Sequence, residues 1–343
     1  MKLLEVRDLK TSFAVKQGSF GKALVKAVDG VSFDVHEGEV LALVGESGCG
    51  KTTVGRSILN LITPQSGEVL FEGRSVLKSS RKELLQLRQK MQIIFQDPYS
   101  SLNPRMNVGE LIGEGLRIHR KASGKALQQQ VLSIMEKVGL HGDYISRYPH
   151  EFSGGQRQRI GIARALILNP QFIVCDEAVS ALDVSVQAQV INLLSDLKNE
   201  FQLSYLFIAH NLSVVEHIAD RVAVMYLGRI VEIGTCQQIF QSPQHPYTQA
   251  LLSAIPRISR TGQRNERIQL SGELPSAIHP PSGCHFHDRC RYSSAKCVEQ
   301  APLHEFVAEQ HSVACHEIHS KNMISSQTPS PSLSKTPPSQ HKT

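Results

Sequence analysis

Hydrophobic and polar positions alternate over Met1–Glu39, apart from a polar stretch, VKQGSFGK, and this alternation predicts half-buried antiparallel strands. Later runs are almost continuously apolar. They lie at Val40–Gly45, Lys90–Asp97, Gln171–Glu177 and Ser204–His210, and in the segment DRVAVMYLGRIVEIG. Strands that are apolar throughout are buried on both faces, so these runs predict the core strands of a mostly parallel sheet covered by helices.

Helical patterns fill the spaces between these runs. KTTVGRSILNLI follows the first buried strand, the pattern is helical from Pro98 to about Ile160, and VQAQVINLLSDLKNEF lies between two later strands, where it supplies a crossover connection. The predicted fold class is therefore α/β. It combines a mostly parallel core, an N-terminal antiparallel β subdomain and an α-helical subdomain inserted at about residues 98–160.

The composition changes near Arg257, which places the end of a large domain at residues 1–256. A polar, basic linker and a loop-rich region with four cysteines follow, and together they form a predicted C-terminal extension at 257–320. Residues 321–343 are rich in Ser, Pro and Thr and predict a disordered tail.

Composition and charge narrow the function only slightly. The 343 residues are 41% hydrophobic and 20% charged, with a net charge of +6, which fits a solvated surface, anionic lipid headgroups or nucleic acid equally well. No run is long enough to cross a bilayer, and MKLLEVRDLK lacks the apolar core of a signal peptide. The expected compartment is the cytoplasm, where disulfides are rare.

The segment GESGCGKTT lies between a predicted strand and a predicted helix, which is the context that a phosphate-binding loop requires. Its glycines let backbone N–H groups converge on phosphate oxygens, Lys51 is expected to reach the β- and γ-phosphates, and Thr52 to ligate Mg²⁺. The alternative is a chance glycine-rich turn. The predicted loop comprises Gly45, Glu46, Ser47, Gly48, Cys49, Gly50, Lys51, Thr52 and Thr53.

The run FIVCDE delivers Asp176 and Glu177 to the carboxyl end of a buried strand, where ligands bind in open α/β sheets. Asp176 suits Mg²⁺, directly or through water, and Glu177 suits a general base for an attacking water. The alternative is a pair of surface carboxylates at the end of a strand.

A second phosphate-binding pattern, Ser153-Gly154-Gly155-Gln156, precedes a basic amphipathic helix. One chain does not need two sites for a γ-phosphate, but two facing chains do, because each would supply this loop to the nucleotide of the other. The alternative is a helix that Ser153 merely caps.

The order of these motifs over Lys2 to about Gly234 resembles the nucleotide-binding subunit of an ATP-binding-cassette (ABC) transporter. GESGCGKT is similar to Walker A, IIFQDP to the Q-loop, IVCDE to Walker B, SALD to the D-loop and His210 to the H-loop. FSGGQ resembles the signature, with Phe152 in place of the usual leucine. The resemblance implies an ABC-type P-loop NTPase that closes as a head-to-tail dimer on two ATP molecules with Mg²⁺.

The resemblance also implies roles for single residues. Glu177, His210 and Gln96 would be catalytic, and Thr52, Gln96 and Asp176 would hold Mg²⁺. Gln96 would sense the γ-phosphate in a loop near the membrane partner. Ser153, Gly154, Gly155, Gln156 and Asp183 would complete the nucleotide site. An aromatic residue near the N-terminus would stack on adenine, and Phe13 is the candidate, with Phe20 the alternative.

The segment SPQHPYTQALLSAIP resembles the HPYT-ALL segment of ATPase subunits in dipeptide and oligopeptide importers. That subfamily implies a second ATPase subunit, identical or paralogous, two integral-membrane permeases and an extracytoplasmic substrate-binding protein. The chain would lie at the cytoplasmic face of the inner membrane, without binding nucleic acid. Metal-chelate cargo stays open. A nucleic-acid ATPase of the same superfamily is the alternative, although the motifs here span only about 165 residues, with no coiled-coil arm. A translation-associated protein would carry two cassettes.

The four cysteines of the extension have the spacing Cys284-x5-Cys290-x6-Cys297-x17-Cys315. Four thiolates in a loop-rich region suit a metal, although zinc sites show tighter pairs. The resemblance implies a [4Fe–4S] cluster, as in some members of the subfamily. Zinc and reduced structural thiols are the alternatives.

Overall fold

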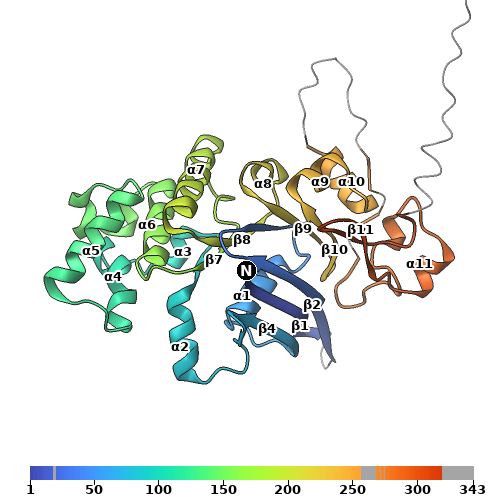
Figure 1. The fold of residues 1–343 in the computed structure, drawn as a ribbon, viewed down its shortest axis with the longest axis horizontal. Coiled ribbons are helices and arrows are strands. Elements are labelled where there is room, and N and C mark those ends of the chain that lie inside the picture. Colours follow the sequence, from blue (N-terminus) through green and yellow to red (C-terminus); the bar gives the residue numbers. More distant parts are fainter. Residues whose placement is uncertain (18–20, 256–267, 271, 274, 319–343) are drawn as a thin grey trace, which may run out of the picture.

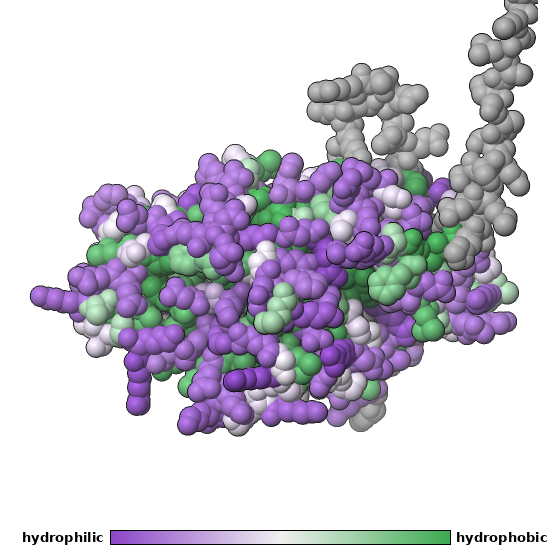
Figure 2. All heavy atoms as spheres, in the orientation of Figure 1, coloured by the Kyte–Doolittle hydropathy of each residue, from purple (hydrophilic) through white to green (hydrophobic). Residues whose placement is uncertain are grey.

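The computed structural model describes residues 1–17, 21–255, 268–270, 272–273 and 275–318. Phe20, the whole of the basic linker and the predicted disordered tail lie outside these residues. In the described part of the chain, no helix has the length and apolar character needed to span a bilayer. The face in Figure 2 is mostly hydrophilic, with hydrophobic side chains showing between the polar ones.

Two sheets form the framework. A four-stranded sheet has the order β2-β1-β4-β5, and every pairing in it is antiparallel. These strands are β1 (Lys2–Gln17), β2 (Gly21–His36), β4 (Ser66–Phe71) and β5 (Arg74–Ser75). The result agrees with the antiparallel N-terminal subdomain that the alternating pattern predicts. It lies in blue at the lower side of Figure 1.

The second sheet has eight strands in the order β11-β12-β10-β9-β3-β8-β7-β6. The strands from β9 to β6 pair in parallel, as expected. These strands are β3 (Val40–Val44), β6 (Met91–Ile94), β7 (Phe172–Asp176), β8 (Ser204–Ala209), β9 (Arg221–Tyr226), β10 (Arg229–Thr235), β11 (His304–Ala308) and β12 (His311–Ala314).

The segment DRVAVMYLGRIVEIG contradicts the prediction of parallel core strands in part. It forms β9 and β10, which pair antiparallel across a two-residue turn in which Tyr226 faces Arg229. Leu227 and Gly228 both have positive φ, at 39° and 80°, as the hairpin turn that matches strand twist requires. Leu at such a position is unusual, which is why the residue pattern did not reveal the turn.

The predicted helical insertion lies between β6 and β7. It contains α3 (Pro98–Ser101), α4 (Val108–Ile118), α5 (Gly124–Lys137) and α6 (Gly154–Leu166). Figure 1 shows α4, α5 and α6 together at one end of the molecule. The other helices are α1 (Lys51–Ile58), α2 (Arg81–Lys90), α7 (Val184–Phe201), α8 (Leu212–Ile218), α9 (Cys236–Gln241), α10 (Pro246–Ser253) and α11 (Ala295–Glu299).

The larger sheet separates two hydrophobic cores. Along β3, Val40, Ala42 and Val44 face the core shared with the insertion helices, whereas Leu41 and Leu43 face the core shared with the N-terminal sheet. This alternation follows from the two-residue period of a strand. It fixes β3, and hence the loop that follows it, from both sides.

The C-terminal extension is joined to the main sheet, because β12 pairs with β10. Glu232 of β10 is fully buried and contacts Nε2 of His311 on β12 at 2.8 Å. Its carboxylate also accepts hydrogen bonds from the backbone N–H groups of Gln244 (2.7 Å) and His245 (2.9 Å). In Figure 1 the extension lies at the end of the molecule opposite the insertion helices.

Candidate functional site

Two glycines in the loop between β3 and α1 leave no room for a side chain. A Cβ atom on Gly45 would lie 2.1 Å from the carbonyl oxygen of Met225, and one on Gly50 would lie 1.9 Å from that of Ala27. Gly50 caps α1 with a φ of 107°. The loop is therefore held tightly between β9 and β2, with backbone N–H groups at the start of a helix, as anion binding requires.

Lys51 is nearly buried, with 4% of its surface exposed. Its Nζ donates to the carbonyl oxygens of Gly45 (2.9 Å) and Glu46 (3.0 Å), so the lysine closes the loop on itself. A phosphate oxygen is a stronger acceptor than either neutral carbonyl, because charge-assisted hydrogen bonds are about twice as strong as neutral ones. The arrangement fits a nucleotide triphosphate.

Asp176 lies at the end of β7 beside this loop and is 1% exposed. Thr52 Oγ1 donates to Asp176 Oδ1 at 2.7 Å, and Arg56 Nη2 lies 3.7 Å from Oδ2. Within the described residues, Oδ2 has no hydrogen-bond partner. Burial raises the pKa of Asp176, although Thr52 and Arg56 oppose the shift. A buried carboxylate oxygen without a hydrogen-bond partner, next to a threonine hydroxyl, fits the oxygen ligands that Mg²⁺ prefers.

Glu177 follows Asp176 with a φ of 47°, a left-handed conformation that turns the chain at the end of β7. Gln96 Nε2 donates to Glu177 Oε2 at 2.8 Å, and His210 Nδ1 lies 3.5 Å from the same oxygen. The structure thus brings residues from the ends of β6, β7 and β8 to one point. Parallel strands place their carboxyl ends at one edge of the sheet, which explains the convergence.

The predicted signature residues lie elsewhere. Ser153 caps α6, where it donates its N–H to Gln156 Oε1 (3.1 Å) and accepts the N–H of Gln156 at Oγ (3.4 Å). Ser153 and Gly154 are exposed, and Figure 1 shows α6 apart from α1. Within the described residues, no hydrogen bond or ion pair joins Ser153–Gln156 to the loop before α1.

Two other predicted residues are also separate from this group. Asp183 is the exposed N-cap of α7, and Phe13 lies on β1 opposite Val25 with 38% of its surface exposed. Phe20, the alternative to Phe13, lies outside the described residues. The structure therefore gathers the Walker A loop, Gln96, Asp176, Glu177 and His210 and leaves the remainder on the surface of the chain.

Sequence reasoning missed two residues that hold the loop. The hydroxyl of Tyr247 accepts the N–H of Glu46 at 2.9 Å, and Arg289 forms an ion pair with the Glu46 carboxylate at 3.0 Å. Tyr247 belongs to the HPYT motif, so the sequence singled out this residue but not its hydrogen bond with Glu46. Arg289 is separated from Glu46 by 243 positions and belongs to no motif.

The four cysteines come near one another without forming a metal site. Burial, with further contributions from Cys297, Cys315 and Cys290, raises the pKa of Cys284 to about 11. Among the described residues, no group of three or more His, Cys, Asp or Glu side chains could hold a metal ion. This arrangement does not support the [4Fe–4S] or the zinc prediction.

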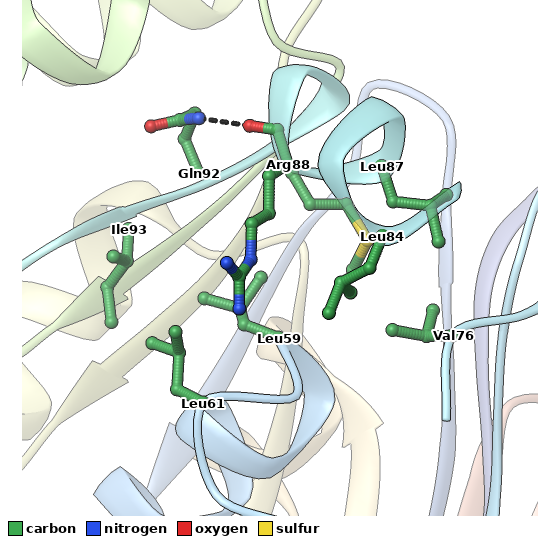
Figure 3. Close-up of a pocket in the computed structure, with 9 residues that line it drawn as sticks. Leu59, Leu61, Val76, Leu84, Leu87, Arg88, Gln92 and Ile93 are labelled. Carbon is green, nitrogen blue, oxygen red and sulfur yellow. Dashed lines mark hydrogen bonds between the residues drawn. The ribbon is translucent and has the colours of Figure 1, made fainter. Parts of the chain in front are cut away.

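An apolar groove lies beside the strand that leads to Gln96 (Figure 3). In it, Gln92 Nε2 donates to the carbonyl oxygen of Arg88. Leu61 is 47% exposed at its edge. The groove collects side chains from the end of α1, from α2 and from β6, and its lining consists of Leu59, Leu61, Val76, Leu84, Leu87, Arg88, Met91, Gln92 and Ile93.

Comparison with known families gives two matches. A family described as "ABC transporter" matches residues 28–180, and one described as "Oligopeptide/dipeptide transporter, C-terminal region" matches residues 231–297.

Curated relatives match over almost the whole chain. The dipeptide transport ATP-binding protein DppF of Haemophilus influenzae is 54% identical over 317 residues, covering 92% of this chain and 97% of that one. The oligopeptide transport ATP-binding protein AppF of Bacillus subtilis is 51% identical and covers the same shares, 92% and 97%. OppF of Escherichia coli, also named for oligopeptide transport, is 52% identical, covering 92% and 96%.

Solved structures agree with the fold. The ATP-binding cassette MJ0796, in a dimeric post-hydrolysis state bound to ADP and Pi, matches with a TM-score of 0.61 and 25% identity, over 68% of this chain and 98% of that one. CbiO1 from Clostridium perfringens matches with a TM-score of 0.60 and 26% identity, over 70% and 91%. These likenesses confirm the predicted α/β P-loop fold.

Proposed function

Because the chain belongs to the family of ATP-binding subunits of dipeptide and oligopeptide ABC transporters, we propose that it hydrolyses ATP to ADP and phosphate and thereby drives peptide import through partner permeases. One observation carries the proposal. Thr52 and Asp176 meet beside the phosphate loop, next to a Glu177 carboxylate that Gln96 and His210 approach.

The chemistry follows from the placement of these groups. The N–H groups of the loop and Lys51 bind and orient the phosphates, and Thr52 and Asp176 hold Mg²⁺, which supplies charge neutralisation when bound. Glu177 takes a proton from the water that attacks the γ-phosphate. Gln96 and His210 orient this water and the γ-phosphate from the two neighbouring strands.

A second ATPase subunit completes the site in this proposal. The exposed Ser153–Gln156 loop of one chain supplies a hydroxyl and backbone N–H groups to the nucleotide held by the loop of its partner. Asp183 takes part in the same contact, because it follows Leu182, whose side chain would lie 3.5 Å from a Cβ atom on Gly154. Phe13 stacks on adenine, and its exposure leaves the ring accessible to a ligand.

Glu177→Gln tests the hydrolytic role. The amide cannot accept the proton of water, so turnover should fall by at least about 100-fold while ATP binding is retained. Nucleotide affinity and phosphate release, measured on one preparation, separate the two effects. Turnover near the wild-type rate would show that Glu177 is not the base.

The groove of Figure 3 is the proposed docking site for an amphipathic helix of the permeases. Its apolar lining matches the apolar face of such a helix. The lining includes β6 residues just before Gln96, so a partner seated there reaches the catalytic group through one short strand. A permease helix docked here would hold the chain at the membrane, and the proposed location is the cytoplasmic face of the inner membrane.

Leu61→Glu tests the docking site, because it places a charge at the edge of the groove on a residue that is already exposed. Co-purification with the permeases in detergent should be lost, while ATP binding by the isolated chain should not change. Leu85→Glu is the matched control, because Leu85 is 43% exposed on α2 but does not line the groove. If Leu61→Glu recovers as much permease as the control Leu85→Glu, the groove is not the docking site.

The proposed cargo is a di- or oligopeptide, presented by an extracytoplasmic binding protein. The relatives named for peptide transport support this cargo over metal chelates, and they also disfavour a role on nucleic acid or ribosomes. The [4Fe–4S] cluster stays a prediction from the sequence. Iron content and the visible spectrum of anaerobically purified protein test it, and a colourless, iron-free preparation would exclude it.

A further inference from the structure

Arg289 connects the C-terminal extension to the phosphate loop. It ends a short turn at His287–Arg289, and its guanidinium forms a two-pronged ion pair with Glu46: Nη1–Oε2 is 3.0 Å and Nη2–Oε1 is 3.3 Å. The Arg289 side chain is 9% exposed and that of Glu46 is 27% exposed. A bidentate pair with one largely buried partner has a fixed geometry, unlike a surface pair between two mobile side chains.

A rigid aromatic cluster places the guanidinium. Arg289 lies over the ring of Tyr226, 5.9 Å from its centroid. The ring of Tyr226 packs against two others, with its centroid 4.7 Å from that of Tyr247 and 5.2 Å from that of Phe286. All three rings are buried. Because β9, α10 and the extension each contribute one ring, Arg289 can reach Glu46 only when the extension is packed against the core.

Three polar groups of Glu46 each have a partner: its backbone N–H, its carbonyl oxygen and its carboxylate. Its N–H donates to the Tyr247 hydroxyl (2.9 Å), its carbonyl accepts from Lys51 Nζ (3.0 Å), and its carboxylate pairs with Arg289. Burial lowers the pKa of Arg289, but the hydrogen bonds with Glu46 and Tyr226 raise it by more. The guanidinium therefore stays charged. Without Arg289, an uncompensated carboxylate would remain on the second residue of a loop that binds a polyanion.

We propose that Arg289 is a positioning residue for ATP binding, which neutralises and fixes Glu46 so that the phosphate loop binds the triphosphate more tightly while the C-terminal extension is docked. The inference rests on the proposed function of this loop. It adds to that function a dependence of nucleotide affinity on a region outside the nucleotide-binding core.

The first experiment replaces Arg289 by Gln in the full-length chain and measures the Kd for ATP and for ADP with Mg²⁺ by calorimetry. The exposed carboxylate should weaken ATP binding by about 10-fold, and ADP binding by less, because repulsion grows with the charge of the ligand. At saturating ATP, kcat should be within about 2-fold of wild type, so that the change appears in KM. Arg289→Lys should recover part of the loss, because it restores charge without the fork.

Two further variants separate charge from packing. Arg291→Gln is the matched control: Arg291 is exposed in the same region and lies over the Tyr292 ring at 4.7 Å, so its loss should leave the Kd unchanged. The double variant Glu46→Gln/Arg289→Gln removes both charges and should bind ATP within about 3-fold of wild type. Glu46→Gln alone should bind ATP at least as tightly as wild type, and this test holds even if Arg289→Gln fails to fold.

The outcomes are distinct. Wild-type ATP affinity in Arg289→Gln would overturn the inference while leaving the proposed function intact. A double variant as weak as Arg289→Gln would also overturn it, because packing rather than charge would then explain the loss, and so would a 10-fold weaker Glu46→Gln. A wild-type chain that binds no ATP would overturn both the inference and the function on which it rests.

Discussion

At the scale of single residues, adjacent carboxylates at the end of β7 have different environments. Asp176 is buried against Thr52 and Arg56, whereas Glu177 turns through a left-handed conformation toward Gln96 and His210. The sequence predicted both candidates because FIVCDE shows a strand that ends in two acids. It could not predict which oxygen lacks a partner, because this depends on side-chain packing.

Asp176→Asn should separate stability from activity. The raised pKa of Asp176 means that its charged form is disfavoured in the folded chain, so the nucleotide-free protein gains stability as the pH falls through this pKa. Asn removes the charge and keeps an acceptor for Thr52. The nucleotide-free Tm should rise by a few degrees, while Mg²⁺-dependent turnover should fall about 100-fold or more.

Thermal unfolding without nucleotide and phosphate release with Mg²⁺ measure the two effects. A lower Tm in the absence of nucleotide would contradict the assignment of a disfavoured buried charge, whereas unchanged turnover would contradict the magnesium role.

At the scale of elements, sequence patterns predicted the segments whose apolar residues are continuous. They identified β3, β7 and β8, which are buried along their whole length, and also β6, a half-buried strand at the edge of the sheet. They did not identify α2, which fully buries none of its residues. Nor could they show that β12 pairs with β10, because that contact depends on a short polar strand far along the chain.

The β10–β12 contact should be sensitive to acid. Glu232 is buried, which raises its pKa, but hydrogen bonds with His311 and with the N–H groups of Gln244 and His245 outweigh this effect and lower the pKa below the ordinary 4.5. A lowered pKa means stabilisation that is present above pH 4.5 and is lost as the pH falls through the folded value. The extension should therefore detach in acid before the core unfolds.

Hydrogen exchange of β12 amides across this pH range measures the detachment. Glu232→Gln cannot titrate, so exchange in this variant should vary less with pH than in the wild type. Equal pH dependence in both proteins would show that another group controls docking.

At the scale of the whole molecule, the described chain contains a complete phosphate loop and a signature loop that lies apart from it. From the order of motifs along the sequence, we predicted that the two loops serve nucleotides held by different chains, because one nucleotide has no use for two γ-phosphate sites in the same chain. The ion pair between Arg289 and Glu46 was beyond prediction, since residues 243 positions apart meet only through the tertiary fold.

The most direct test of the two-chain site is turnover per chain as a function of protein concentration, for the wild type and for Ser153→Arg. If a partner completes each site, ATP turnover per chain rises with protein concentration. In Ser153→Arg the turnover per chain should be at least about 100-fold lower, although the variant still binds ATP. A strict monomer that hydrolyses ATP at the same rate per chain at every concentration, with Ser153→Arg equally active, would contradict the account.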